Sequence, residues 1–194
     1  MAAMTSAYPA QLEVDAPAPQ NRLTVFFRYF CAIPHVIVLY LLGIALNVVT
    51  IIAWFAILIT GKYPAGMLGF AIGIHQWQAR TIGYVFLLSG AYPPFALGAA
   101  DSYPIRLSIV EQVEGRNRVT VFFRLFMLIP HIIVLYLVQI AAFVVLFIAW
   151  IAALVTGSVP AGMHGFLAGA VRWMVRVGAY GGLLTDEYPP FSLN

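Results

Sequence analysis

Charged side chains are scarce in this chain of 194 residues, and that scarcity decides its class. Asp, Glu, Lys and Arg make up 9% of the residues and hydrophobic types 62%, whereas soluble domains carry about 25% charged residues. We therefore predict an integral membrane protein. Lys62 is the one lysine, the other basic residues are arginines, and the formal net charge is +3. Such a chain has no basic patch for nucleic acid, which is not an expected partner.

Acidic residues and cysteine are also few, which excludes several kinds of chemistry. The seven carboxylates all lie outside the apolar segments, so a proton relay through membrane-embedded acids is not expected. Cys31 is the single cysteine, which rules out an intramolecular disulfide and a CxxC metal or redox site. No GxSxG, HExxH or glycine-rich phosphate loop occurs in the sequence. We therefore expect that the protein is not an enzyme and has no cofactor.

What the chain does contain is an internal repeat. Residues 21–40, NRLTVFFRYFCAIPHVIVLY, return as NRVTVFFRLFMLIPHIIVLY at 117–136. We predict four parts: an N-terminal polar segment at 1–20, membrane repeat 1 at 21–98, a cytoplasmic linker at 99–116, and membrane repeat 2 at 117–194. The N-terminal segment lacks the basic start of a cleavable signal peptide, so the first apolar run is expected to be an uncleaved anchor.

Each repeat opens with an amphipathic lead-in. In residues 20–33, bulky aromatic groups share one helical face, while Arg22 and Arg28 point toward another. That arrangement is typical of a helix at the membrane interface. Pro34 and Pro130 are expected to interrupt the chain there or bend it into the membrane, because proline lacks an N–H and crowds the preceding turn.

A long apolar run follows each lead-in, at residues 33–60 and 129–156. Each run predicts a helix about 42 Å long at 1.5 Å per residue, which exceeds the roughly 30 Å of a hydrocarbon core. One helix of each repeat is therefore predicted to span the membrane. Trp54 and Trp150 lie near the far ends of these helices and are expected in an aromatic belt.

The next segments, residues 67–88 and 163–184, have two possible interpretations. They are long enough to return across the membrane, and a Gly-x-x-x-Gly spacing favours close helix packing. Their arginines instead favour a helix lying flat at the interface, since an arginine at mid-membrane depth costs about 2.5 to 3.5 kcal/mol. We prefer the returning helix, with the packing residues Gly69, Gly73, Gly165 and Gly169.

Two short segments before the repeats show apolar alternation, residues 8–14 and 103–110. Alternation is the pattern of a strand. The two segments are predicted either to pair as a short ribbon at the membrane surface or to remain extended linkers.

Four motifs stand out, and repeat 2 carries all of them: FFR followed by IPH, a TGxxP turn, an Arg-Trp with a second Arg four residues after the first, and a final YPPF. Together they resemble a bacterial membrane-protein family catalogued only as a domain of unknown function. The resemblance implies a helical membrane domain and no reaction. Repeat 1 departs from the pattern at Gln76, where repeat 2 has Arg172, and at residues 90–91, where repeat 2 has Asp186 and Glu187.

Lipid phosphate is the ligand that the sequence suggests best, because a guanidinium group can donate two hydrogen bonds to one phosphate. The predicted headgroup-binding residues are Arg28, Arg124, Arg80, Arg172, Arg176, Trp77 and Trp173. His35 and His131 occupy equivalent positions and could face each other as ligands of a haem or a metal. The other interpretation, which we prefer, is that both are amphipathic residues at headgroup level.

The predicted fold is an all-α membrane protein, with tandem two-helix repeats forming a four-helix transmembrane bundle and interfacial lead-in helices. Both copies are expected to cross in the same direction, related by an axis along the membrane normal. The predicted function is a non-catalytic, lipid-interacting scaffold or accessory subunit, whose partners are membrane lipids, other membrane subunits or itself. The alternatives are a small transporter or channel with a pathway between the repeats, and a haem-carrying redox subunit. Arginines in the lead-ins and linker predict a multi-pass protein of the bacterial inner membrane with cytoplasmic termini.

Overall fold

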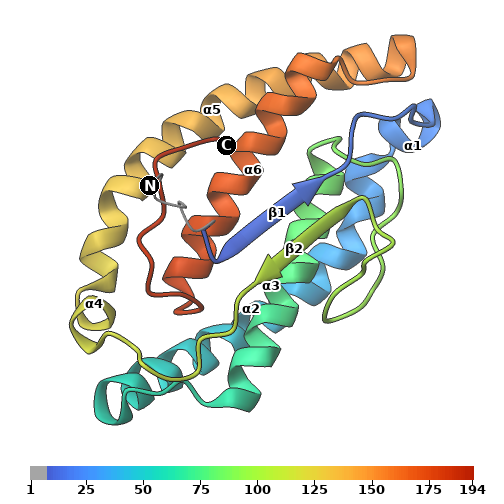
Figure 1. The fold of residues 1–194 in the computed structure, drawn as a ribbon. Helices are drawn as coiled ribbons and strands as arrows, with labels where there is room; N and C mark the ends of the chain where they lie inside the picture. Colours follow the sequence, from blue (N-terminus) through green and yellow to red (C-terminus); the bar gives the residue numbers. More distant parts are fainter. Residues whose placement is uncertain (1–7) are drawn as a thin grey trace, which may run out of the picture.

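A computed structural model describes residues 8–194. The first seven residues of the predicted N-terminal polar segment lie outside the described residues. Helices dominate the described part of the chain, and two short strands precede the repeats (Figure 1). The elements in order are β1 (Ala10–Val14), α1 (Arg22–Phe26), α2 (Arg28–Thr60), α3 (Ala65–Val85), β2 (Ile105–Ile109), α4 (Arg118–Phe122), α5 (Arg124–Thr156) and α6 (Ala161–Gly181).

The lead-ins are short helices whose starts are fixed by asparagine. Asn21 Oδ1 accepts hydrogen bonds from the backbone N–H groups of Leu23 and Thr24, and Asn117 caps α4 in the same way. Such a cap satisfies N–H groups that have no partner inside the helix. Each lead-in ends at a phenylalanine, Phe27 in repeat 1, with φ −89° and ψ 9°. The long helix starts at the next residue.

The predicted interruption at proline is wrong. Pro34 lies inside α2 and Pro130 inside α5, so each costs a single backbone hydrogen bond within a continuous helix. The break comes earlier, at Phe27 and Phe123, and the arginine after each break points into the protein, as described below. At their far ends the long helices stop at Gly61 and Gly157, with φ of 73° and 82°, a left-handed conformation that glycine adopts readily.

Helices α2 and α5 are the two helices of the described chain that are long and apolar enough to cross a membrane, judged by length and composition alone. Helices α3 and α6 do not meet that test. A mostly helical protein built from two repeats is therefore present, whereas the predicted four-helix transmembrane bundle is not confirmed.

The two long helices run antiparallel (Figure 1). Each lead-in packs on the far end of the other repeat's long helix. Trp150 Nε1 donates to the carbonyl oxygen of Val25 at 3.0 Å, and Trp54 Nε1 donates to that of Val121 at 3.1 Å. These tryptophans therefore hydrogen-bond to the other repeat, and their predicted place in an aromatic belt stays a prediction. The prediction that both repeats cross in the same direction is also wrong. A two-fold axis along the membrane normal would make α2 and α5 parallel, whereas they are antiparallel.

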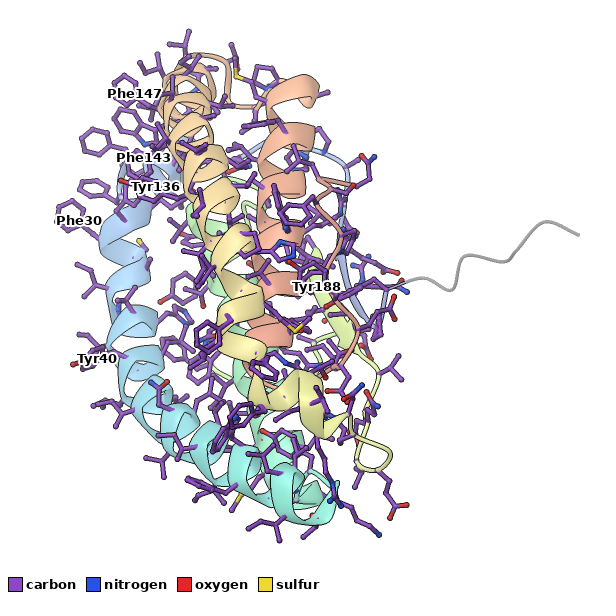
Figure 2. The ribbon with its side chains drawn as sticks, turned by 90° about the vertical axis from the view of Figure 1, so that its left-hand side faces the viewer. Phe30, Tyr40, Tyr136, Phe143, Phe147 and Tyr188 are labelled. Atoms are coloured by element: carbon purple, nitrogen blue, oxygen red, sulfur yellow. The ribbon has the colours of Figure 1, made fainter. Side chains whose placement is uncertain are left out.

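The predicted ribbon is confirmed. Strands β1 and β2 pair antiparallel, with Leu12 opposite Leu107. Leu12, Ile105 and Leu107 are buried against the helices, whereas Gln11 and Ser108 are exposed on the other face. Three layers result: the ribbon, a middle layer of α3 and α6, and an outer layer of α2 and α5 (Figures 1 and 2).

Candidate functional site

Arg28, the first residue of α2, lies inside the protein. Its side chain is fully buried. Its Nη1 donates to the carbonyl oxygens of Tyr84 and Ser89 at 2.8 and 2.7 Å, and its Nη2 donates to Gln20 Oε1 at 2.6 Å. The guanidinium lies over the Tyr84 ring, 4.4 Å from its centre. These carbonyls lie at or just beyond the end of α3, where helical carbonyls lack partners within the helix. Arg28 therefore ties the start of α2 to the end of α3.

Arg124 makes the equivalent contacts in repeat 2. Its Nη1 donates to the carbonyl oxygens of Tyr180 and Thr185 at 2.8 and 2.6 Å. Its Nη2 donates to Asp186 Oδ1 at 2.7 Å, and its guanidinium carbon lies 3.9 Å from the centre of the Tyr180 ring. The partner of Arg124 is thus a carboxylate, where the partner of Arg28 is an amide.

Asp186 is the centre of a small charge network. Arg116 donates from Nη2 to Oδ1 at 2.8 Å and from Nε to Oδ2 at 3.0 Å, and the backbone N–H of Asn117 donates to Oδ2 at 2.8 Å. Burial raises the pKa of Asp186, but the hydrogen bonds from Arg116, Asn117 and Arg124 outweigh burial, so its pKa lies below the ordinary value. The carboxylate is therefore held ionised between two arginines.

The predicted lipid-binding role is wrong for five residues, because their polar groups are enclosed by the protein. Arg28, Arg124 and Arg80 are at most 2% exposed. Arg80 donates to the carbonyl oxygens of Gly98 and Ala96 at 2.7 and 2.5 Å. The indole N–H groups of Trp77 and Trp173 are also enclosed, because both tryptophans are buried and donate to histidines inside the protein.

Arg172 and Arg176, the remaining predicted lipid ligands, lie on the ribbon side of α6. Arg172 Nε donates to the carbonyl oxygen of Leu12 in β1 at 3.1 Å. The Arg176 guanidinium lies 5.9 Å from the centre of the Tyr8 ring. Both are half-buried. Their position relative to lipid stays a prediction.

The two equivalent histidines lie in separate aromatic clusters, one in each repeat. Trp77 Nε1 donates to His35 Nδ1 at 2.9 Å, and the imidazole stacks on the Phe95 ring with centres 3.8 Å apart. In repeat 2, Trp173 donates to His131 Nδ1 at 3.2 Å, and the imidazole stacks on Phe191. Both histidines are fully buried. The alternative in which they face each other as ligands of a haem or a metal is wrong, whereas their depth in the membrane stays a prediction.

The glycine spacing serves a different contact from the one predicted. A Cβ atom at Gly73 would lie 3.3 Å from the backbone N of Gly98, and one at Gly169 would lie 2.7 Å from the carbonyl oxygen of Leu193. The segment after YPPF therefore packs against both glycines, where the prediction placed another helix. Cβ atoms at Gly69 and Gly165 would meet nothing within 4 Å. The helix-packing role predicted for the four glycines is wrong.

The outer layer presents a continuous apolar surface, which we call the apolar face. It is formed by the outward sides of α1, α2, α4 and α5. Figure 2 shows its aromatic side chains pointing away from the middle layer, with exposed fractions between 61% and 74%: Phe30, Tyr40, Tyr136, Phe143 and Phe147. Soluble monomers rarely expose an apolar patch larger than a few hundred Å². This surface is therefore the main candidate for a binding function.

Charged side chains gather on the opposite side of the molecule and at its ends. On the ribbon, Arg106 pairs with Glu13 at 3.3 Å and with Asp15 at 2.8 Å. At one end, Lys62 pairs with Glu114 at 2.6 Å. Within α2 and α5 the only charged residues are the first ones, Arg28 and Arg124, and both point inward. The apolar face is therefore free of charge along both long helices.

Gln20 and Arg116 are structural residues that the sequence analysis did not single out. They occupy equivalent positions in the two copies, and each donates to an equivalent carbonyl, that of Leu87 or Leu183. A signal was available. Repeat 2 has an arginine at 116 and an acid at 186, where repeat 1 has Gln20 and Gly90, and opposite charges gained in the same copy suggest an ion pair.

Comparison with known proteins gives a family and no activity. A domain of unknown function (DUF4389) matches residues 22–96 and again residues 118–192. Neither the curated proteins nor the solved structures contain a match to this chain. Since the two matched segments together cover most of its length, the chain belongs to the DUF4389 family and carries the domain twice.

Proposed function

We propose that this protein is a non-catalytic membrane module that holds its apolar face in the acyl region of a lipid bilayer. On this proposal it resides in the bacterial plasma membrane, where it acts as a lipid-embedded scaffold or accessory subunit. The observation that carries the proposal is the separation of charge. The apolar face has no charged side chain along two helices of 33 residues each, whereas the ribbon opposite carries Glu13, Asp15 and Arg106.

The energetic argument rests on the exposed side chains themselves. Removing a Val, Leu, Ile or Phe side chain from water contributes about 1.5 to 3 kcal/mol when burial is complete. Side chains of these types are exposed along the whole of α2 and α5. A lipid environment would therefore stabilise this surface by far more than the net stability of a typical domain, about 5 to 15 kcal/mol.

A groove on α5 supports acyl chains as the neighbours of this surface. It is lined by Tyr136, Gln139, Ile140, Phe143, Val144 and Phe147, and it is almost entirely apolar. A linear hydrocarbon chain can fill such a groove, in which Gln139 is the one residue with a polar side-chain amide. By contrast, the space between the repeats, where a transport pathway would run, contains His75 packed against Gly178 and Gly182. These observations favour the membrane module over the transporter.

Vesicle flotation tests the proposal. The purified chain, freed of detergent in the presence of phosphatidylcholine and phosphatidylglycerol vesicles, is expected to float with them and to resist an alkaline wash. The variant Ile44→Asp/Ile140→Asp places a charge at equivalent sites on the apolar face, where both parent side chains are about half exposed. It should float less, because an aspartate in the acyl region is unfavourable, by up to about 2.5 to 3.5 kcal/mol at mid-membrane depth.

The matched control is Gln11→Asp/Ser102→Asp, which places two charges at exposed positions outside the apolar face. It is expected to float like the parent chain. If the parent stays soluble and monomeric without lipid or detergent, or if both double variants lose flotation equally, the proposed function is wrong.

A further inference from the structure

We infer that α2 and α5 lie in the plane of the membrane, immersed in one lipid leaflet, with the ribbon in the water on the same side. This inference rests on the proposed function and adds the orientation of the binding surface. The occupant of the apolar face is then the acyl region of a single leaflet, and neither long helix crosses the bilayer.

The first argument is the position of the ribbon along the helices. Gln76, in the middle of α3, donates to the carbonyl oxygen of Leu107, and Arg172, in the middle of α6, donates to that of Leu12. The ribbon therefore lies over the midpoint of the middle layer. If the long helices stood upright in a bilayer, the charged side chains of the ribbon would be held at mid-membrane depth.

Those ribbon charges are exposed. The side chains of Glu13 and Asp15 are 68% and 51% exposed, and that of their partner Arg106 is 32% exposed. No described element covers them on the outer side, where Gln11 and Ser108 are also exposed. An upright molecule would place this polar surface in hydrocarbon, whereas an in-plane molecule places all of it in water.

The second argument is the distribution of apolar residues around each long helix. Along α2, one stripe is exposed from the first turn to the last and includes Phe30, Tyr40, Ile51 and Ile59. The opposite side is buried against the protein near the two ends of the helix, at Ala32, Ala53 and Ile57, whereas no residue from 36 to 52 is buried. The exposed apolar side therefore runs the whole length of the helix, and an in-plane position would immerse all of it in one leaflet.

The third argument comes from the two ends. Arg22 is exposed and its Nε lies near Gly157 at the end of α5, while the exposed Arg118 lies near Gly61 at the end of α2. A cation at a helix C-terminus is favourable. In the plane of the membrane, both arginines would lie at the rim of the apolar face and at the same depth, within reach of lipid phosphate.

Cysteine labelling separates the two orientations. In a Cys31→Ala background, Lys62→Cys and Ser158→Cys probe equivalent turns at the opposite ends of the long helices. In right-side-out vesicles with an impermeant maleimide, in-plane helices predict that both cysteines react from the same side and to similar extents. Upright antiparallel helices predict that they react from opposite sides, and that result would overturn the inference.

Two further sites complete the experiment. Gln11→Cys, on the outer face of the ribbon, is expected to react from the same side as the two turns, whereas upright helices would protect it in lipid. Tyr40→Cys, on the apolar face, is expected to remain protected. Flotation keeps the two proposals distinguishable: a chain that does not bind vesicles contradicts the proposed function, whereas one that floats with its two turns on opposite sides contradicts only the in-plane orientation.

Discussion

Arg28 in repeat 1 and Arg124 in repeat 2 begin equivalent helices and donate to equivalent carbonyls, but their third partners differ. Arg124 meets the carboxylate of Asp186, which Arg116 also holds. Arg28 meets the amide of Gln20, and a glycine stands where repeat 2 has the acid. The shared feature is the pair of carbonyls, so the arginine serves mainly to satisfy the end of the following helix. The carboxylate is needed only where a second arginine is present.

The largest effect is expected from removing that carboxylate. Asp186→Ala leaves Arg116 and Arg124 facing each other without a counter-charge, and removing one partner of a buried ion pair typically destabilises a protein by about 3 to 5 kcal/mol. Chemical unfolding in detergent, followed by tryptophan fluorescence, measures the change. Glu187→Ala, at the neighbouring exposed position, is the control. Equal stability of the two variants would contradict the role given to Asp186.

The next effect concerns the arginine without an acid. Arg28→Met retains much of the side-chain volume but removes the donor to the carbonyls of Tyr84 and Ser89. The Tyr84 carbonyl keeps its bond from the Leu87 N–H, whereas a buried group left unsatisfied costs about 1 to 3 kcal/mol. Arg22→Met, at an exposed arginine of the same lead-in, should change stability little. If Arg28→Met is as stable as Arg22→Met, the capping role of Arg28 is wrong.

The repeats should also differ in their response to acid. Because folding lowers the pKa of Asp186, its contribution to stability is complete above the pKa of an unfolded aspartate, about 3.9, and is lost as the pH falls through the lower folded value. Unfolding measured from about pH 6 down to about pH 3 should show this loss in the parent. Asp186→Asn should show a shallower acid limb, and an unchanged limb would contradict the assignment.

An exchange of partners would make repeat 1 resemble repeat 2. Gln20→Arg alone adds a second cation beside Arg28 and should destabilise the fold. Gly90→Asp supplies the missing acid, so the double variant should recover stability, with a coupling energy of about 0.5 to 3 kcal/mol. A double-mutant cycle measures it. Strictly additive effects would show that the two positions do not interact.

The smallest expected difference lies at two equivalent glycines. A Cβ atom at Gly169 would meet the carbonyl oxygen of Leu193 at 2.7 Å, whereas at Gly73 the nearest atom is 3.3 Å away. Alanine gains about 1 kcal/mol of helix propensity over glycine, and the clash at Gly169 should reverse that gain. Thermal unfolding should therefore rank Gly73→Ala above Gly169→Ala. The opposite order would mean that the segment after YPPF yields more easily in repeat 2.

Much of the fold could be predicted from the sequence because its signals are local. The apolar runs predict the long helices, and the alternation of apolar residues predicts the ribbon. The lipid-binding role predicted for the buried arginines is wrong because the local sequence is the same in two cases. A guanidinium next to an apolar run can donate to a lipid phosphate or to a backbone carbonyl. That choice depends on where α3 ends in space. The direction of α5 relative to α2 likewise depends on contacts between repeats, for which one sequence gives no local signal.

The exchange of lead-ins between the repeats has a consequence for how the chain folds. Trp150 bonds to a residue 125 positions away, and α4 closes on α2 in return. These are contacts of high sequence separation, which slow folding. A polypeptide with a single copy would lack both the lead-in that covers its long helix and the second strand of the ribbon. It would find them only in another molecule, so a protein with one copy of this domain should assemble as a symmetric dimer in which the copies exchange their lead-ins.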